Sequence, residues 1–135
     1  MSAESARAAV ARSLPATGKW DEPHLVERLV SAGLAPQALA GGRGEDYWQV
    51  PVLQYRVGNA TLHAYIYPDS AARRRITNGL DTLTAAPTGT AGPYPLPRLL
   101  ISNNNLAAVL VGGTERHQER VSNALLAGLS SSEKR

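Results

Sequence analysis

The chain of 135 residues contains no cysteine. This absence excludes disulfide bonds, thiolate metal sites and a cysteine nucleophile. The chain also lacks any apolar stretch approaching the roughly 20 residues that a membrane-spanning helix needs. Residues 1–14, rich in alanine with Glu4, Arg7 and Arg12 among them, lack the apolar core of a secretion signal. We therefore predict no transmembrane span and leave peripheral membrane association open. If a leader has been removed, we expect the chain in the envelope or periplasm; otherwise we expect it in the cytoplasm.

Length and charge predict one domain with a core of its own. A chain of this size buries roughly two-thirds of its unfolded surface, so it needs no covalent staples. The formal net charge of +3 is modest for a basic protein. We expect an N-terminal alanine-rich segment over residues 1–19, in which residues 3–13 form a frayed helix, one α+β domain over residues 20–129, and a disordered tail over residues 130–135.

An internal repeat is the strongest pattern in the chain. Arg75-Ile76-Thr77-Asn78-Gly79-Leu80 returns as Arg120-Val121-Ser122-Asn123-Ala124-Leu125. Upstream of these segments, residues 62–67 and 106–111 are two apolar strand-like runs. A strand and a helix therefore repeat together, which predicts one supersecondary unit used twice, over about residues 50–80 and 98–126.

Local signals predict the elements of each unit. Asp21, Asp69 or Ser70, and Thr114 are N-cap residues of three predicted helices. Trp20 and Leu25 have the spacing of a hydrophobic staple, and Gly33 is placed to end the first helix. Glycine and asparagine favour tight turns at Gly58-Asn59 and at Asn103-Asn104-Asn105. The predicted strands are residues 47–57, 61–67, 99–101 and 106–111, and residues 36–46 and 83–97 are predicted loops, the second rich in proline and exposed.

These elements predict an α+β fold. The simplest packing is a four-stranded, mainly antiparallel sheet with helices over one face, preceded by one or two N-terminal helices. Residues 106–111 are apolar at every position, so both faces of that strand should be buried inside the sheet. The order of the strands stays open, because sequential and interleaved arrangements of two units both satisfy the pattern.

A polar and aromatic sheet face is the first candidate binding site. Side chains alternate along a strand, so this face is separate from the aliphatic one. Tyrosine and arginine are favoured where proteins bind, because they offer large area with a polar end. The alternative is that the Pro-rich connection or the N-terminal helix folds over this face and makes it core. The candidate residues are Gln54, Arg56, His63, Tyr65 and Tyr67.

The remaining motifs predict no catalytic, cofactor or metal site. His24, His63 and His117 come from distant segments without metal-ligand spacing. The Gly41-Gly42-Arg43-Gly44 run lacks the strand before it and the lysine after it that a phosphate loop needs. The sequon Asn59-Ala60-Thr61 is too short to predict glycosylation by itself.

Arg73, Arg74 and Arg75 form a candidate basic patch. On a helix, successive residues turn by about 100°, so the three side chains fan out instead of forming one stripe. No motif of a nucleic-acid-binding fold accompanies them. Nucleic acid is therefore the least favoured partner.

One segment resembles a known group of proteins. Residues 97–113, Pro-Arg-Leu-Leu-Ile-Ser-Asn-Asn-Asn-Leu-Ala-Ala-Val-Leu-Val-Gly-Gly, precede a terminal helix. This pattern is similar to the C-terminal motif of small uncharacterised bacterial envelope proteins, often lipoproteins, and the likeness extends over about residues 25–128. The chain departs from the motif at Arg98 and Leu99, where the family has histidine and an aromatic, and it lacks the lipid-bearing cysteine. The resemblance implies an α+β fold and an envelope setting, and no activity.

Three functions follow as hypotheses. The first is a non-catalytic protein-interaction domain, an accessory subunit of a larger bacterial assembly, whose partner is another protein or a second copy of the chain. The second is a small-molecule-binding protein or weak enzyme that uses His63 and the tyrosines. The third is nucleic-acid binding through Arg73, Arg74 and Arg75.

Overall fold

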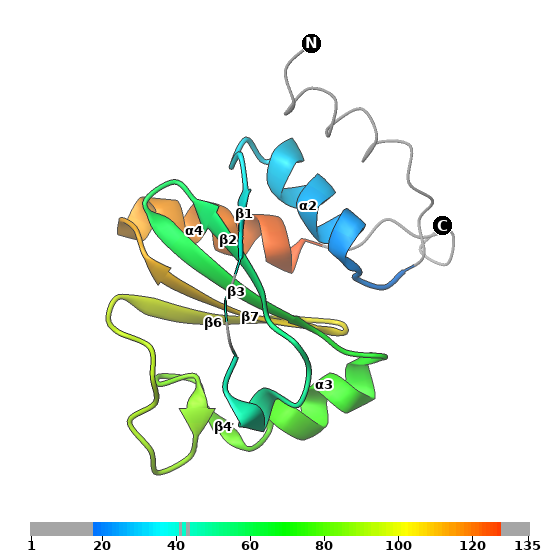
Figure 1. Ribbon diagram of the computed structural model, residues 1–135, viewed down its shortest axis with the longest axis vertical. Helices are drawn as coiled ribbons and strands as arrows, with labels where there is room; N and C mark the ends of the chain where they lie inside the picture. Colours follow the sequence, from blue (N-terminus) through cyan, green and yellow to red (C-terminus); the bar gives the residue numbers. More distant parts are fainter. Residues whose placement is uncertain (1–17, 41, 43, 128–135) are drawn as a thin grey trace.

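The computed structural model describes residues 18–40, 42 and 44–127 and confirms the α+β class. The main sheet has five strands in the order β1-β2-β3-β7-β6, and every neighbouring pair is antiparallel (Figure 1). The predicted helix at residues 3–13 and the predicted tail at residues 130–135 lie outside the described residues. The helices are α2 (Glu22–Ser31), the 3₁₀ helix η1 (Asp46–Trp48), α3 (Ser70–Thr77) and α4 (Glu115–Leu126), and the strands are β1 (Gln37–Leu39), β2 (Leu53–Val57), β3 (Ala60–Ile66), β4 (Leu80–Asp81), β5 (Ala86–Pro87), β6 (Arg98–Asn103) and β7 (Leu106–Gly112).

Two hairpins form four of the five strands of the sheet, as predicted. Gly58 and Asn59 connect β2 to β3, and Gly58 has φ +64°, which glycine adopts without steric cost. Asn104 and Asn105 connect β6 to β7, and Asn104 takes φ +54°. The two hairpins meet where β3 pairs with β7, so the repeated units lie side by side in one sheet and their strands are not interleaved. As predicted, β7 lies inside the sheet, and Leu106–Leu110 is buried at every position.

Three helices begin at the predicted N-caps. The side chain of Asp21 accepts a hydrogen bond from the His24 amide at 2.9 Å. Asp69 does the same for the Ala72 amide at 2.7 Å, and Thr114 for the His117 amide at 3.1 Å. Each bond satisfies a backbone donor that the first helical turn leaves free, which is why these short polar residues set the helix starts.

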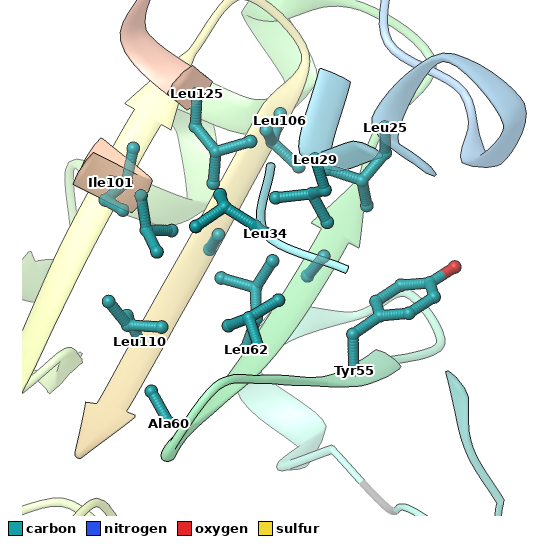
Figure 2. Close-up of a cluster of buried hydrophobic side chains, with 14 of the residues drawn as sticks. Leu25, Leu29, Leu34, Tyr55, Ala60, Leu62, Ile101, Leu106, Leu110 and Leu125 are labelled. Carbon is teal, nitrogen blue, oxygen red and sulfur yellow. The ribbon is translucent and has the colours of Figure 1, made fainter. Parts of the chain in front are cut away.

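Helices α2 and α4 cover one face of the sheet. Leu25 and Leu29 of α2, and Val121 and Leu125 of α4, belong to one buried cluster with the aliphatic side chains of β3, β6 and β7 (Figure 2). The guanidinium of Arg120 donates to the carbonyl of Ala32 at 3.1 Å and connects the two helices. This cluster is the aliphatic core that the alternation of β3 predicts.

The opposite face is covered as well, which corrects the prediction of helices on one face. Ala72 and Ile76 of α3 pack against Tyr67 and Val109 in a second buried cluster, and α3 lies across the sheet from α2 and α4 (Figure 1). A short amphipathic helix carries no signal for the face it will cover, so the sequence could not assign α3 to a side. No helix of the described residues has the length and apolar character to cross a bilayer.

The loops also contain more structure than predicted. Residues 36–46, predicted as a loop, include the edge strand β1, which is exposed at all three positions and so has no alternating pattern to reveal it. The Pro-rich connection, predicted to be exposed and extended, includes β5, which pairs with β4 just before the connection, and buries Ala85, Ala86 and Tyr94. The connection therefore contributes side chains to the core in addition to joining β4 to β6.

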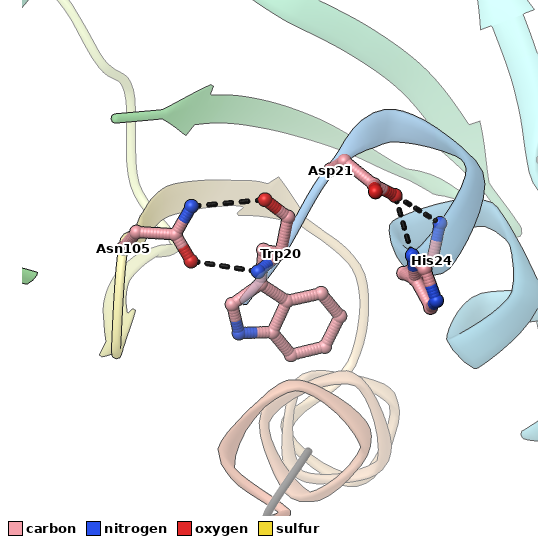
Figure 3. Close-up of polar contacts among 4 residues, drawn as sticks. All are labelled: Trp20, Asp21, His24 and Asn105. Atoms are coloured by element: carbon pink, nitrogen blue, oxygen red, sulfur yellow. Dashed lines mark hydrogen bonds and ion pairs between the residues drawn. The ribbon is translucent and has the colours of Figure 1, made fainter. Parts of the chain in front are cut away.

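A buried amide joins the segment before α2 to the sheet. The Asn105 side chain accepts from the Trp20 amide at 2.7 Å and donates to the Trp20 carbonyl at 2.9 Å (Figure 3). It also donates to the Tyr67 carbonyl at 2.8 Å. We call this set of three bonds the Asn105 clamp. Nearby, the Asn104 amide donates to the Gly18 carbonyl at 2.7 Å, so the β6–β7 turn holds residues 18–20 in place.

Candidate binding surfaces

The predicted polar-aromatic face splits into a buried part and a partly exposed part. Tyr65 and Tyr67 are only 1% and 4% exposed, so the expectation of a half-exposed tyrosine surface is wrong. Gln54 and His63 face each other across β2 and β3 and are partly buried, and Arg56 is exposed. The two buried tyrosines fit the alternative interpretation, in which the Pro-rich connection folds over this face and makes it core.

The cover is a hydrogen-bonded aromatic cluster. Tyr65 stacks on Trp48 with ring centroids 4.1 Å apart and planes 9° apart. The Trp48 indole N–H donates to the Tyr94 hydroxyl at 2.9 Å, and that hydroxyl also bonds to the Tyr65 hydroxyl at 2.9 Å. Tyr67 donates to the Trp48 carbonyl at 2.8 Å. Burial raises the pKa of Tyr65 and of Tyr67, so both hydroxyls stay protonated and act as structural hydrogen-bonding groups.

His63 lies at the rim of this cluster. The Gln54 amide nitrogen donates to the Nδ1 atom at 2.9 Å, and the imidazole centroid is 5.4 Å from that of Tyr94. Burial lowers the pKa of His63, so the imidazole is neutral at pH 7. Because an amide nitrogen only donates, the proton of the neutral ring in this arrangement is on Nε2.

The glycine-rich loop crosses this face instead of forming a phosphate loop. A Cβ at Gly42 would lie 1.7 Å from Oε1 of Gln54, and a Cβ at Gly44 would lie 3.1 Å from the Tyr65 ring. Because glycine has no Cβ, the backbone makes this approach without displacing the Gln54 side chain or the Tyr65 ring. Gly42 and Gly44 therefore let the loop pack on β2 and β3 next to His63.

A small pocket opens between His63 and the Pro-rich connection. Its volume is about 320 Å³, at the lower end of the range of small-molecule sites. His63 and Tyr65 come from the predicted set, whereas Gln54, Arg56 and Tyr67 do not line it. The lining residues are Glu45, Thr61, His63, Tyr65, Pro93, Tyr94, Pro95 and Val111.

The three predicted basic residues do not act together. Arg73 donates to the Asn104 carbonyl at 2.9 Å and to the Thr77 hydroxyl at 3.1 Å, so it fastens α3 to the β6–β7 turn. Arg74 and Arg75 are exposed on the same helix. The basic patch predicted from the sequence is therefore one structural arginine with two solvated neighbours.

The three histidines have separate structural partners. His24 contacts the Asp21 carboxylate at 2.6 Å, His63 bonds to Gln54, and Nε2 of His117 donates to the Val57 carbonyl at 2.7 Å. Within residues 18–40, 42 and 44–127, no three histidine or carboxylate side chains gather into a group that could hold a metal ion. Each histidine thus fixes a local piece of the fold.

The outer edge of β6 is a surface that sequence reasoning missed. The Gly112 amide donates to the Pro97 carbonyl at 2.8 Å, and this register turns the backbone N–H and C=O groups of Arg98, Leu100 and Ser102 away from β7. These groups have no hydrogen-bond partner among the described residues. β6 is six residues long, twice the length of the other edge strand, β1, so it offers the longer free edge.

Two exposed leucines lie at the beginning of this edge. Leu83 and Leu96 are 77% and 76% exposed, more than any other large apolar residue described. Arg98 holds the two arms of the connection together, because its side chain donates to the Leu83 carbonyl at 2.6 Å and to the Tyr94 carbonyl at 3.0 Å. The proline-rich composition around Leu83 and Leu96 is the one sequence signal that could have indicated fixed, exposed leucines.

Comparison of the chain with known protein families, with curated proteins and with solved structures finds no match. The resemblance to envelope proteins therefore stays a prediction, and the function is argued from the surfaces above.

Proposed function

We propose that this chain is a non-catalytic protein-interaction domain that binds an extended segment of a partner protein along β6. The observation that supports it is the free edge of β6 beside two exposed leucines. An unpaired edge is a template for another strand, and soluble proteins usually cover or blunt one. Here the edge is six residues long and carries no lysine or internal proline to block pairing.

The chemistry of the edge defines the partner. The outward groups of Arg98, Leu100 and Ser102 alternate donors and acceptors, so they pair with a partner backbone in extended conformation. Leu83 and Leu96 provide an apolar contact at one end of the edge. The partner segment is therefore extended, about five or six residues long, and apolar at the end that meets the two leucines.

The envelope setting and the role of accessory subunit belong to the same proposal. They are supported by the resemblance of residues 97–113, which include all of β6, to the C-terminal motif of bacterial envelope proteins. On this basis, the partner is a component of a larger bacterial assembly. Capture from the membrane fraction and the soluble fraction, done separately, tests the compartment.

The decisive variant removes one outward hydrogen-bond donor without touching the sheet. Proline at position 102 deletes the Ser102 N–H, which faces away from β7, and edge strands tolerate proline at such positions. Ser102→Ala is the matched control because it keeps the N–H. The wild type and both variants are immobilised and exposed to extracts of the source organism, and bound proteins are identified by mass spectrometry.

The expected result is a reproducible partner that is captured by the wild type and Ser102→Ala and lost with Ser102→Pro. The pair Leu83→Ser and Leu96→Ser should weaken capture of the same protein, whereas Leu39→Ser, at the opposite edge of the sheet, should not. If the Ser102→Pro variant captures the same partner as well as the wild type does, the proposal is overturned. A dimer of this chain that dissociates in the Ser102→Pro variant would replace the partner protein with a second copy.

The pocket at His63 supports a second candidate, a small-molecule site. A neutral imidazole, the Glu45 carboxylate and aromatic walls line one volume of about 320 Å³. A thermal-shift screen of small neutral and cationic compounds tests it. Stabilisation by a compound should disappear in a His63→Gln variant, and a response that survives this change would exclude His63 as the binding group.

A further inference from the structure

Two adjoining pockets lie at the end of the sheet where β2 turns into β3. Their volumes are about 320 Å³ and 480 Å³, and both are lined by Gly58, His117 and Arg120. The first pocket extends over the start of α4, and the second extends along the loop that joins α2 to β1. Neither pocket includes a residue of the β6 edge, so this region is separate from the surface proposed above.

Three arginines from two elements line these pockets. Arg56 comes from β2, and Arg116 and Arg120 come from α4. Arg120 donates to the Ala32 carbonyl through one nitrogen, and among the described residues its other guanidinium nitrogens make no hydrogen bond. No carboxylate lines either pocket, and within the part of the chain that the structure describes Arg56 and Arg116 have no ion-pair partner.

His117 is held in place between the two pockets. Its ring lies between two glycines: a Cβ at Gly58 would be 3.0 Å from the ring, and a Cβ at Gly113 would also be 3.0 Å from it. The Nε2–H group donates to the Val57 carbonyl at 2.7 Å. That bond fixes the imidazole, and among the described residues Nδ1 has no hydrogen-bond partner.

We infer that the two adjoining pockets form one site for a phosphomonoester group. Guanidinium groups bind phosphate through paired, charge-assisted hydrogen bonds, and a cluster without carboxylates favours an anion. The phosphate occupies the region that the two pockets share, at Arg120 and His117, with Arg116 from the first pocket and Arg56 from the second. The organic group that the phosphate carries extends into the second pocket toward Leu34 and Gln37.

A phosphomonoester has two sources, a soluble metabolite or the head group of a lipid such as phosphatidic acid. Glycerol 3-phosphate tests the first by isothermal titration calorimetry with the full chain. Vesicles of phosphatidylcholine with and without phosphatidic acid test the second by co-sedimentation. Nuclear magnetic resonance of the His117 ring protons during either titration shows whether the ligand occupies this site.

Arg56→Gln and Arg116→Gln are the test variants, because neither side chain makes a hydrogen bond within the described residues. Each should weaken binding at least tenfold. Arg75→Gln is the matched control, because it removes the same charge from an exposed position on α3, away from both pockets. The melting temperature of all three variants should remain that of the wild type.

Saturable binding that depends on Arg56 and Arg116 but not on Arg75, with a shift of the His117 resonances, supports the site and identifies the ligand source. Absence of saturable binding in both arms overturns the inference. Equal weakening in all three variants also overturns it, because it would show attraction to the net charge alone.

Discussion

The Asn105 clamp offers a sharp test of how this fold is held together. Apart from tyrosine and tryptophan, Asn105 is the only buried polar residue in the described part of the chain, with 2% of its surface exposed. Its side chain makes three hydrogen bonds, to both backbone groups of Trp20 and to the Tyr67 carbonyl. Asn105→Ala removes all three and leaves three buried backbone groups without a partner.

The magnitude follows from these bonds. A net hydrogen bond contributes about 1 kcal/mol, and a buried group left unsatisfied costs about 1–3 kcal/mol. Asn105→Ala should therefore lower the free energy of unfolding by about 3 kcal/mol or more, a large share of the roughly 5–15 kcal/mol typical of a domain. At about 4 °C per kcal/mol, the melting temperature should fall by about 12 °C.

Urea denaturation followed by circular dichroism measures the loss, and in a Trp48→Phe background the fluorescence of Trp20 reports the local change. Asn104→Gly is the matched control: it loses one bond, to the Gly18 carbonyl, but suits the φ of +54° at that position. It should change the free energy of unfolding by less than about 1 kcal/mol. A loss below about 1 kcal/mol in Asn105→Ala would refute the reasoning, because residues 18–20 would then be held by packing alone.

An aspartate at the same position gives an independent check. The Asn105→Asp variant keeps the acceptor for the Trp20 amide but places a carboxylate against the carbonyls of Trp20 and Tyr67. Burial and these carbonyls raise the pKa of the introduced carboxyl, so the folded state binds a proton more tightly than the unfolded state. The stability of this variant relative to wild type should therefore improve as the pH falls.

Three further predictions concern the covered face. Tyr65→Ala should lower the free energy of unfolding by about 3–5 kcal/mol, as for other buried aromatic side chains, because Tyr65 stacks on Trp48 and is 1% exposed. Urea denaturation measures this loss, and a small loss would show that this face of the sheet is a surface. Tyr94→Phe should cost about 2 kcal/mol in the same assay, because it leaves the Trp48 indole N–H unpaired, and an unchanged midpoint would contradict that. Burial lowers the pKa of His63 below its ordinary value of 6.5, so just below that pH the unfolded state binds more protons than the folded state. The free energy of unfolding should therefore decrease as the pH falls through about 6.5. Denaturation curves at several pH values measure this dependence, and His63→Gln should flatten it.

The fold was predictable where short-range chemistry decides it. Asp21, Asp69 and Thr114 cap helices because a short polar side chain reaches an amide three residues ahead, which is a local relation. Gly58 and Asn104 turn the chain because their φ angles are positive. The apolar run from Leu106 to Leu110 predicted burial on both faces, because each of its side chains must leave water whichever element covers it.

The candidate site was only partly predictable. Alternation along β3 placed His63, Tyr65 and Tyr67 on one face, but a tyrosine suits a half-exposed surface and a covered one equally well. Tyr94, which closes that face, comes from a proline-rich segment far along the chain. The β6 edge was missed because an edge is a property of strand order, and two strand-strand-helix units are compatible with several orders.

By itself, the sequence determined the helix starts, the two hairpin turns, the α+β class and the repeat, because each depends on residues within a few positions of one another or on simple periodicity. The tertiary structure alone decided which segment covers each face of the sheet, which strand is left at the edge, and which arginines gather around His117. These outcomes depend on contacts between segments that lie tens of residues apart, and no local pattern encodes the partner that a side chain will meet.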